Sequence, residues 1–255
     1  AKSYGKNRYV IYSKAYGAQV FHKIEITKQL FYGVKNKEFV VYYQPIIDTS
    51  DSKAKHVEAL LRWQHPFRGF MMPGEFIEIA ENSSHIKEIT WLVIDASFKE
   101  QIKWKKSGYD INISINLSSR LISDREFVIK LEELIKRKKY ESKEITFEIT
   151  ESSIIENFDD AIFVLNGIHA LGFKIALDDF GTGYSSLTYL QKLPIDIIKI
   201  DKRFINGITK NEKDQLVLKY VIDLAHALKM KVVCEGAENQ REVDILKSLQ
   251  TDYIQ

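Results

Sequence analysis

The chain has 255 residues, of which 45% are hydrophobic and 28% are charged, and its formal net charge is +2. This composition is that of a globular protein with one large core or two modest ones, and the near-neutral charge gives no reason to expect binding to DNA or RNA. The single cysteine, Cys234, excludes an internal disulfide and fits a reducing compartment, so we expect a cytoplasmic protein. No stretch approaches the roughly 18 apolar residues of a membrane span, so we expect no membrane contact from this fragment.

Strand-like and helix-like patterns alternate from about residue 38 to the end of the chain. Strands are predicted at 38–47, 56–63, 111–118, 145–151, 173–179, 196–201 and 231–236. Helical patterns separate most of these strands; the one at 161–172, for example, ends at Gly172, which is typical of a helix C-terminus. Repeated strand-then-helix units favour a parallel sheet covered by helices.

The pattern within the strands favours a closed barrel over an open sheet. In an open sheet with helices on both faces, buried strands are nearly continuous apolar runs. The strands 111–118 and 145–151 instead alternate apolar and polar residues, which fits an apolar face toward the helices and a polar face toward the inside of a (β/α)-type barrel. Such a barrel has its active site at the C-terminal ends of the strands. Six polar residues are expected to converge there: Glu58, Asn116, Glu148, Asp178, Lys199 and Glu235.

This set of side chains predicts a metal site. Four carboxylates and an amide are hard oxygen ligands, which suit Mg²⁺ or Mn²⁺ better than zinc. The adjacent acids Asp178 and Asp179 can serve two ions, while Gly181 and Gly183 permit a tight turn beside a phosphate. Two ions about 3.5–4 Å apart activate water and stabilise the leaving oxygen of a phosphoryl displacement. Lys199, near cations and partly desolvated, is expected to have a lowered pKa and to orient or deprotonate that water.

The same residues lie in motifs that together resemble the EAL domain. Six motifs occur in order: EALLRW (58–63), ISINLS (113–118), EITE (148–151), DDFGTGYSSL (178–187), DIIKID (196–201) and CEGAE (234–238). The resemblance covers residues 37–255 and implies a modified TIM (β/α)8-type barrel. It also implies metal-dependent hydrolysis of cyclic di-GMP to linear pGpG in bacterial second-messenger signalling.

The resemblance implies a role for each matching residue. Six residues correspond to the ligands of two Mg²⁺ or Mn²⁺ ions: Glu58, Asn116, Glu148, Asp178, Asp179 and Glu235. Lys199 positions or activates the water, and Glu151 anchors the loop after Asp179, which begins with Phe180, Gly181, Thr182 and Gly183. Positions that contact substrate or support the site are Gln44, Leu60, Arg62, Glu238 and Gln255. A homodimer through the loop after Asp179 and its neighbouring helix is also implied.

Both ends of the chain differ from a complete EAL domain. Residues 1–12 resemble the tail of a GGDEF diguanylate cyclase domain without its catalytic loop, so no synthesis of cyclic di-GMP is expected. The predicted organisation is a GGDEF-like tail at 1–13, a linker helix at 14–36 and an EAL domain at 37–255, as a fragment of a GGDEF–EAL protein. Any sensory or membrane-spanning region would precede residue 1. The chain stops at Gln255, so the eighth strand is expected to be truncated, with impaired barrel closure unless the protein continues.

Two other functions fit part of the pattern. Some EAL domains lose hydrolysis and act as cyclic di-GMP receptors, usually after losing metal ligands, whereas every ligand position is intact here. A glycoside hydrolase on a TIM barrel needs two carboxylates and leaves the amide, the lysine and the extra acids unexplained. Removal of metal by EDTA separates the phosphodiesterase, which loses activity, from the glycosidase, which does not.

Overall fold

A computed structural model describes residues 14–155, 157–181 and 190–255. The chain divides into two compact units, Ala1–Val40 with Arg62–Ile86 and Val41–Leu61 with Lys87–Gln255. The predicted linker segment is helical, as α1 (Lys14–Lys35). The GGDEF-like tail at 1–13 lies outside the described residues, so it and the domain boundaries stay predictions.

The first unit is built around three aromatic rings. Its elements are α1, β3 (Gly69–Met71), the 3-10 helix η2 (Pro73–Glu75), α2 (Ile77–Glu81) and the adjoining ends of β1 (Phe39–Asp48) and β2 (Ala54–His65). Phe39, Trp63 and Phe76 are buried, with ring centroids 5.1–5.7 Å apart. At Gly33 of α1 a Cβ would lie 3.0 Å from Phe39 and from Trp63, so this helix packs on the rings through a glycine.

The second unit contains a closed eight-stranded barrel, which confirms the predicted fold class. Its remaining strands are β4 (Asn112–Asn116), β5 (Ile145–Thr150), β6 (Lys174–Phe180), β7 (Ile197–Ile200), β8 (Lys231–Cys234) and β9 (Tyr253–Ile254). The order is β1-β9-β8-β7-β6-β5-β4-β2, and β1 pairs with β2 to close the ring, while β3 extends β2 as a hairpin. Neighbours from β2 round to β9 are parallel, but β1 is antiparallel to β9, which is the modification of the regular barrel.

The last strand of the barrel, β9, has only two residues but closes it. Tyr253 and Ile254 of β9 pair with β8 on one side and with Asp48 and Ile47 of β1 on the other. The expectation of impaired closure is therefore wrong, because two residues are sufficient to bridge β8 and β1.

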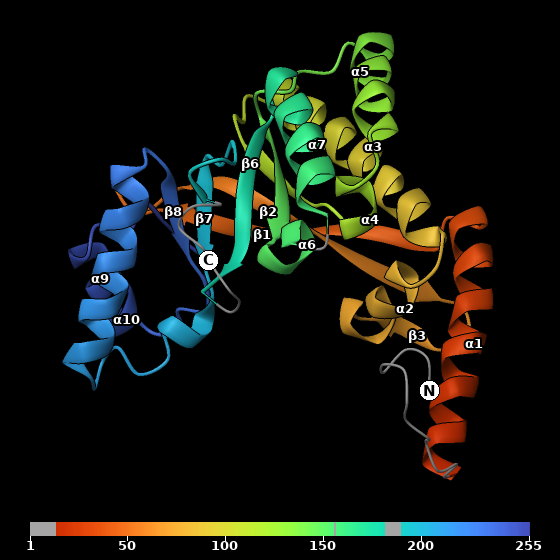
Figure 1. The fold of residues 1–255 in the computed structure, drawn as a ribbon, viewed down its shortest axis with the longest axis horizontal. Coiled ribbons are helices and arrows are strands. Elements are labelled where there is room, and N and C mark those ends of the chain that lie inside the picture. The colour runs from red at the N-terminus through yellow and green to blue at the C-terminus, as the bar shows by residue number, and fades with distance from the viewer. Residues whose placement is uncertain (1–13, 156, 182–189) are drawn as a thin grey trace. The chain divides into compact units, whose positions relative to one another are not determined.

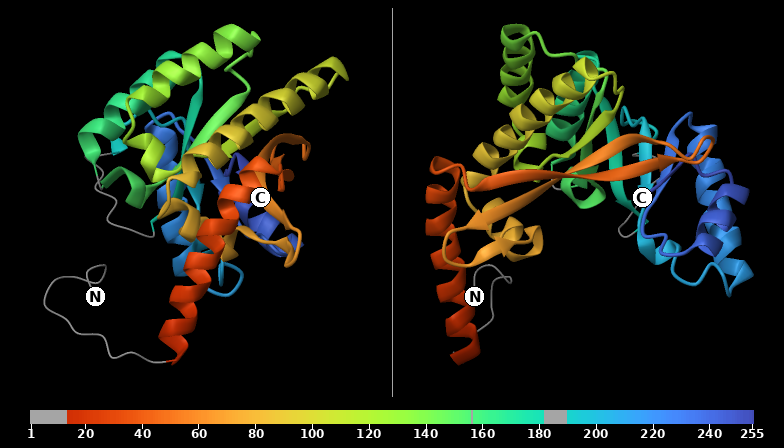
Figure 2. Two further views of the ribbon diagram at one scale, coloured as in Figure 1. Left: turned by 90° about the vertical axis from the view of Figure 1, so that its right-hand side faces the viewer. Right: turned by 180° about the vertical axis from the view of Figure 1, so that it is seen from behind.

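Helices cover the outside of this barrel. The long ones are α3 (His85–Lys106), α5 (Glu126–Lys138), α7 (Phe158–Ala170), α9 (Glu212–Ala227) and α10 (Gln240–Ser248). Three short ones follow the ends of strands: α4 (Ser119–Ile122) after β4, α6 (Glu151–Ile155) after β5 and η3 (Lys202–Phe204) after β7. Figure 1 shows α7 next to β6, α5 next to α7, and α9 and α10 together beside β8, and Figure 2 agrees. The outward apolar residues of β4 and β5, such as Ile113 and Phe147, are fully buried beneath this layer. None of the described helices is long and apolar enough to cross a lipid bilayer.

Candidate active site

The interior of the barrel is apolar at one level and charged at the next. Ile46, Ala176, Ile197 and Val233 form a buried cluster inside it. Every second residue of a strand faces the interior, so two positions further along three of these strands lie Asp178, Lys199 and Glu235. The apolar layer therefore forms a floor beneath a charged layer at the C-terminal ends of the strands.

Lys199 lies at the centre of the charged layer. Its ammonium nitrogen contacts four carboxylates, at 2.7 Å from Glu235, 2.8 Å from Glu148, 3.3 Å from Glu58 and 3.5 Å from Asp178. The Lys199 side chain is only 2% exposed. Solvent therefore screens these contacts little, and the ammonium is the main counter-charge that the described residues supply to the four acids.

Two amides complete the contacts of Glu58. Asn116 Nδ2 donates to Glu58 Oε1 at 2.7 Å, and Gln255 Nε2 donates to Glu58 Oε2 at 2.6 Å. The register of β4 and β5 places Asn116 directly beside Glu148. The six residues expected to converge are thus in one place, and Gln255 joins them from the end of the chain.

Burial and mutual repulsion shift the pKa values of the acids. Burial, together with the charges of Glu58 and Asp178, raises the pKa of Glu148 to about 8 despite the attraction of Lys199. Burial also raises the pKa values of Asp178 and Glu235. At Glu58 burial acts in the same direction, but Lys199 and the hydrogen bonds from Gln255 and Asn116 outweigh it and lower the pKa. The cluster without metal therefore holds more negative charge than one ammonium neutralises, and Glu148 is the acid that takes up a proton most readily.

The lowered pKa predicted for Lys199 applies to a site that holds cations, so it stays a prediction. Burial alone would lower it, but attraction to Glu148, Asp178, Glu58 and Glu235 outweighs burial and raises the pKa well above its ordinary value. The prediction placed cations beside the amine, whereas the described neighbours are carboxylates. Lys199 is accordingly a charged hydrogen-bond donor in this structure.

A β-bulge accommodates the two adjacent aspartates. Consecutive residues of a regular strand face opposite sides of the sheet, but the pairing of β6 with β7 shifts register between Leu177 and Phe180. Asp179 has a left-handed backbone with φ 56°, and its N–H donates to Asp178 Oδ1 at 2.9 Å. The carboxylate of Asp179 is near enough to raise the pKa of Asp178. The bulge thus interrupts the alternation that would separate the two acids.

The donor set of the cluster fits a hard cation. Glu148 Oε1, Gln255 Oε1 and both carboxylate oxygens of Glu151 are buried and have no hydrogen-bond partner among the described residues. Buried acceptors left in this way cost free energy unless a donor or a cation satisfies them. Within the described ranges no three His, Cys, Asp or Glu residues are already arranged to hold a metal ion. Four carboxylates, those of Glu58, Glu148, Asp178 and Glu235, contact Lys199 instead.

Comparison with known proteins shows the family. The family model of the EAL domain matches residues 27–255. The chain belongs to the EAL-domain family. It is 32% identical over its whole length to the bifunctional diguanylate cyclase/cyclic di-GMP phosphodiesterase MucR of Pseudomonas aeruginosa, covering 37% of that protein. It is 34% identical over 95% of its length to the cyclic di-GMP phosphodiesterase PdeR of Escherichia coli, covering 36% of that protein. The chain therefore spans about a third of the length of these relatives.

A solved structure of the family has the same fold. The PaMucR phosphodiesterase in complex with c-di-GMP is 32% identical, with a TM-score of 0.84 over 91% of this chain and 94% of that one. This agreement supports the assignment of the closed barrel of the second unit to the EAL fold.

The other residues matched to the EAL motifs lie at several places. Gln44 of β1 and Glu238 are exposed, and Leu60 of β2 is half-buried. The N–H of Glu238 donates to Glu242 Oε2 at 2.8 Å, in the first turn of α10. Arg62 belongs to the first unit, so its predicted contact with substrate stays a prediction.

The segment after the second aspartate is described only in part. Phe180 is buried, and Gly181 has φ 87° with no room for a Cβ, which would lie 2.5 Å from the Phe204 ring. Thr182 and Gly183 lie outside the described residues. Glu151, at the start of α6, is 7% exposed. Its role as an anchor of the loop stays a prediction.

One residue of the barrel interior, His56, was not predicted from the sequence. His56 lies two positions before Glu58 on the same face of β2 and is buried, with its ring 4.5 Å from that of Tyr253. It lines a small cavity in the barrel with Ser114, Glu148 and Lys199. Burial lowers the pKa of His56 to about 4, so it is neutral at pH 7. The alternation that selected Glu58 also selects His56.

Proposed function

We propose that this EAL domain hydrolyses the phosphodiester bond of cyclic di-GMP to linear pGpG with Mg²⁺ or Mn²⁺, and so lowers the level of this second messenger. The observation that carries the proposal is the contact of four carboxylates with Lys199 at the C-terminal end of the barrel. The names of MucR and PdeR support the same activity, since both include cyclic di-GMP phosphodiesterase.

The metal ligands that we propose are those of the family motifs: Glu58, Asn116, Glu148, Asp178, Asp179 and Glu235. The unpaired buried oxygen of Glu148 and the all-oxygen donor set support two hard cations at this place. When bound, such ions supply Lewis-acid activation of water and stabilise charge on the phosphate oxygens. The bulge at Asp179 supports a ligand role for both aspartates, because it keeps them close together.

Lys199 acts on the water in this proposal. The carboxylates that contact Lys199 are those that would hold the cations, so with them in place Lys199 would lose the neighbours that raise its pKa and would be free to orient the water by hydrogen bonding. The water oxygen bonds to phosphorus while the bond from phosphorus to one ribose oxygen breaks, which opens the ring to pGpG. The water gives up a proton to a basic group of the cluster, and the leaving oxygen takes one up.

The remaining assignments place the substrate around the cluster. We propose that Gln44, Leu60, Arg62, Glu238 and Gln255 contact cyclic di-GMP or support the site. Gln255 has the strongest support, because its amide nitrogen binds Glu58 while its amide oxygen is buried without a described partner. We also propose that Glu151 anchors the loop after Asp179 and that the domain forms a homodimer, which the family motifs support. The single cysteine supports a cytoplasmic location.

The test is incubation of the protein with cyclic di-GMP and either Mg²⁺ or Mn²⁺, with chromatographic detection of pGpG. We expect linear product from the natural chain, none with EDTA, and none from Glu58→Gln. Glu212→Gln, at an exposed position of α9, is the matched control and is expected to keep full activity. Binding of cyclic di-GMP without cleavage would support the receptor alternative, and metal-independent activity on a glycoside would support the glycosidase.

A further inference from the structure

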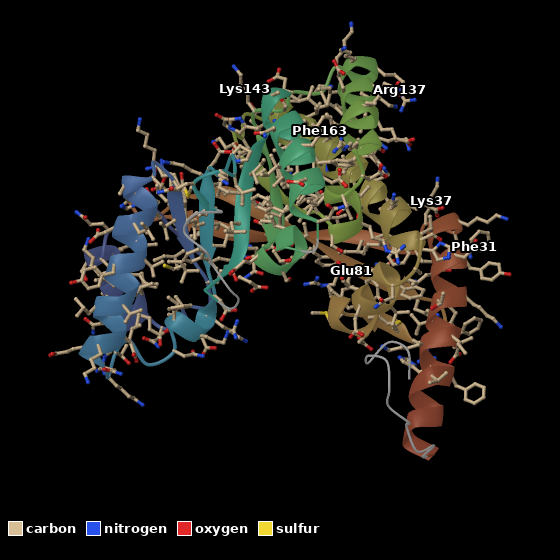
Figure 3. All side chains as sticks on the ribbon, in the orientation of Figure 1. Phe31, Lys37, Glu81, Arg137, Lys143 and Phe163 are labelled. Carbon is tan, nitrogen blue, oxygen red and sulfur yellow. The ribbon has the colours of Figure 1, made fainter. Side chains whose placement is uncertain are left out.

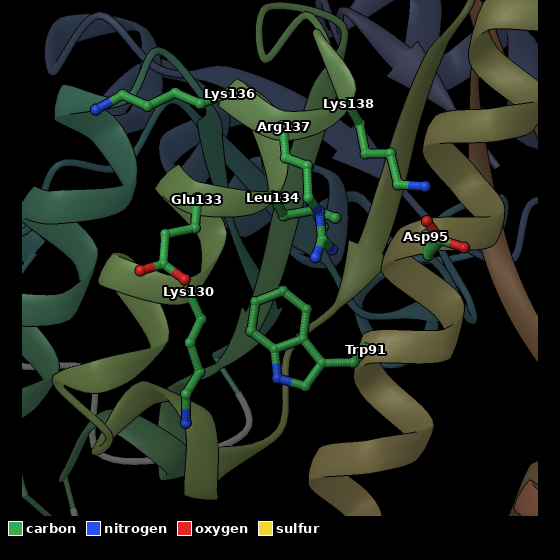
Figure 4. Close-up of a pocket in the computed structure, with 8 residues that line it drawn as sticks. All are labelled: Trp91, Asp95, Lys130, Glu133, Leu134, Lys136, Arg137 and Lys138. Carbon is green, nitrogen blue, oxygen red and sulfur yellow. The ribbon is translucent and has the colours of Figure 1, made fainter.

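A groove on the outside of the barrel unit lies between α3 and α5. It has a volume of about 810 Å³, within the range of small-molecule sites. Trp91 of α3 and Leu134 of α5 supply its apolar lining (Figure 4). Four Lys or Arg side chains and two acidic side chains complete the wall, so the groove carries a net positive charge.

Two of the cations form no ion pair with a described carboxylate. Lys130 pairs with Glu126 at 2.9 Å and Lys136 with Glu132 at 2.5 Å. By contrast, no carboxylate among the described residues lies within 4.0 Å of Arg137 or Lys138. Both side chains are exposed at the last turn of α5 and therefore remain available to an anion.

The acids of the groove oppose an anion only weakly. Asp95 of α3 pairs with Lys99 and accepts a hydrogen bond from Tyr140 at 3.2 Å. Its charge is therefore balanced locally. Glu133, the other acid, is exposed, so solvent screens its repulsion.

Trp91 supplies a flat aromatic surface inside the groove. The indole is half-buried and rests on Phe127, with ring centroids 5.1 Å apart. Phe127 also contacts Phe147, the residue before Glu148, at 6.0 Å. The indole is thus held by the packed core on one side, and Figure 4 shows the Arg137 side chain extending toward it.

We propose that this groove binds a nucleotide, with the base stacked on Trp91 and the phosphates held by Arg137 and Lys138. Base stacking on an aromatic side chain and charge-assisted hydrogen bonds to phosphate are each worth about tenfold or more in affinity. The planar guanidinium of Arg137 suits the geometry of phosphate. Neither feature takes part in the barrel cluster, so the groove is a second site.

The test is isothermal titration with GTP as the probe, in EDTA, with guanosine and inorganic phosphate titrated separately. We expect GTP to bind, with an affinity that falls as salt rises, and each separate part to bind at least tenfold more weakly. Combined Arg137→Ala and Lys138→Ala, and Trp91→Ala alone, should each weaken GTP binding at least about tenfold. The control is Lys143→Ala, since Lys143 is exposed and projects apart from Arg137 (Figure 3).

Three results would overturn the proposal. The first is no measurable heat with GTP at millimolar concentration. The second is phosphate binding as tightly as GTP, which indicates a simple anion site. The third is loss of GTP binding in Gln255→Ala but not in the groove variants, which places the nucleotide in the barrel instead. Thermal melts of each variant establish that a weaker affinity does not come from unfolding.

Discussion

Replacement of Lys199 by methionine tests whether its ammonium stabilises the acid cluster in the absence of metal. Methionine has a similar length but no charge, so the change leaves four closely spaced carboxylates without their cation. Removal of one partner of a buried ion pair costs about 3–5 kcal/mol, because the remaining charge is buried without compensation. Lys199 is 2% exposed, so no discount for solvent screening applies. We expect the free energy of unfolding to fall by about 3–5 kcal/mol.

The assay is urea unfolding followed by circular dichroism, in EDTA, at pH 5.5 and pH 8. Burial raises the pKa of Glu148, Asp178 and Glu235 in the folded state. Without the ammonium these pKa values rise further. A carboxyl with a raised folded-state pKa destabilises the fold as pH rises through that value. The deficit of Lys199→Met should therefore be larger at pH 8 than at pH 5.5.

Lys143→Met is the matched control, because Lys143 is exposed. Its effect is expected to stay within about 0.5 kcal/mol at both pH values. A deficit below about 1 kcal/mol for Lys199→Met at pH 8, or one that does not change with pH, would refute the argument. Either result would mean that protonation or solvent, and not Lys199, neutralises the cluster.

Three further substitutions test other parts of the fold. The pKa of His56 is about 4 in the folded protein against 6.5 for a free histidine, so the natural chain should lose about 2 kcal/mol of unfolding free energy as pH falls from 7 to 5. His56→Gln should remove this loss; thermal melts that show the same pH dependence for the variant and the natural chain would contradict it. Gly236 has φ 78°, and a Cβ added there would lie 2.5 Å from the Cβ of Lys202. Gly236→Ala should therefore displace the neighbouring Glu235 and lower both stability and hydrolysis, and an unchanged melting temperature would contradict this. Gly33→Ala should crowd the buried rings of Phe39 and Trp63 at a cost of about 1–3 kcal/mol, which exceeds the roughly 0.5–1 kcal/mol that alanine gains over glycine inside a helix, so the melting temperature should fall. Gly74→Ala, which meets nothing within 4 Å, should leave it nearly unchanged.

The alternation of residues predicted most of the barrel and of the cluster. All seven predicted strands occur, and the inward positions of β4, β5 and β7 are those that period two selects. The prediction succeeds because such a strand faces helices on one side and a polar interior on the other, so apolar and polar residues alternate along its sequence. The closure through β9 was not predictable, because the pairing of a two-residue strand depends on β1 and β8 and not on its own pattern.

The site also has features that no local pattern encodes. The bulge at Asp179 is defined by the pairing of β6 with β7, and the pair of adjacent acids is the feature of the sequence that indicates it. The direction of the Lys199 pKa shift depends on whether the neighbouring carboxylates face its ammonium alone or also a divalent cation, and no local pattern shows which. A sequence identifies the groups of such a cluster more readily than their protonation.

Lys199 and the proposed cations use the same carboxylates, so Lys199 should weaken metal binding, although the proposed hydrolysis requires it. Glu58, Glu148, Asp178 and Glu235 all contact its ammonium in the described structure. Their release from Lys199, and the repulsion between ammonium and metal, both subtract from metal affinity. Calorimetric titration of Lys199→Met with Mn²⁺ at pH 8 should therefore show affinity at least about tenfold above that of the natural chain, with little or no hydrolysis. Equal or weaker affinity would show that the ammonium and the metal do not compete for these acids.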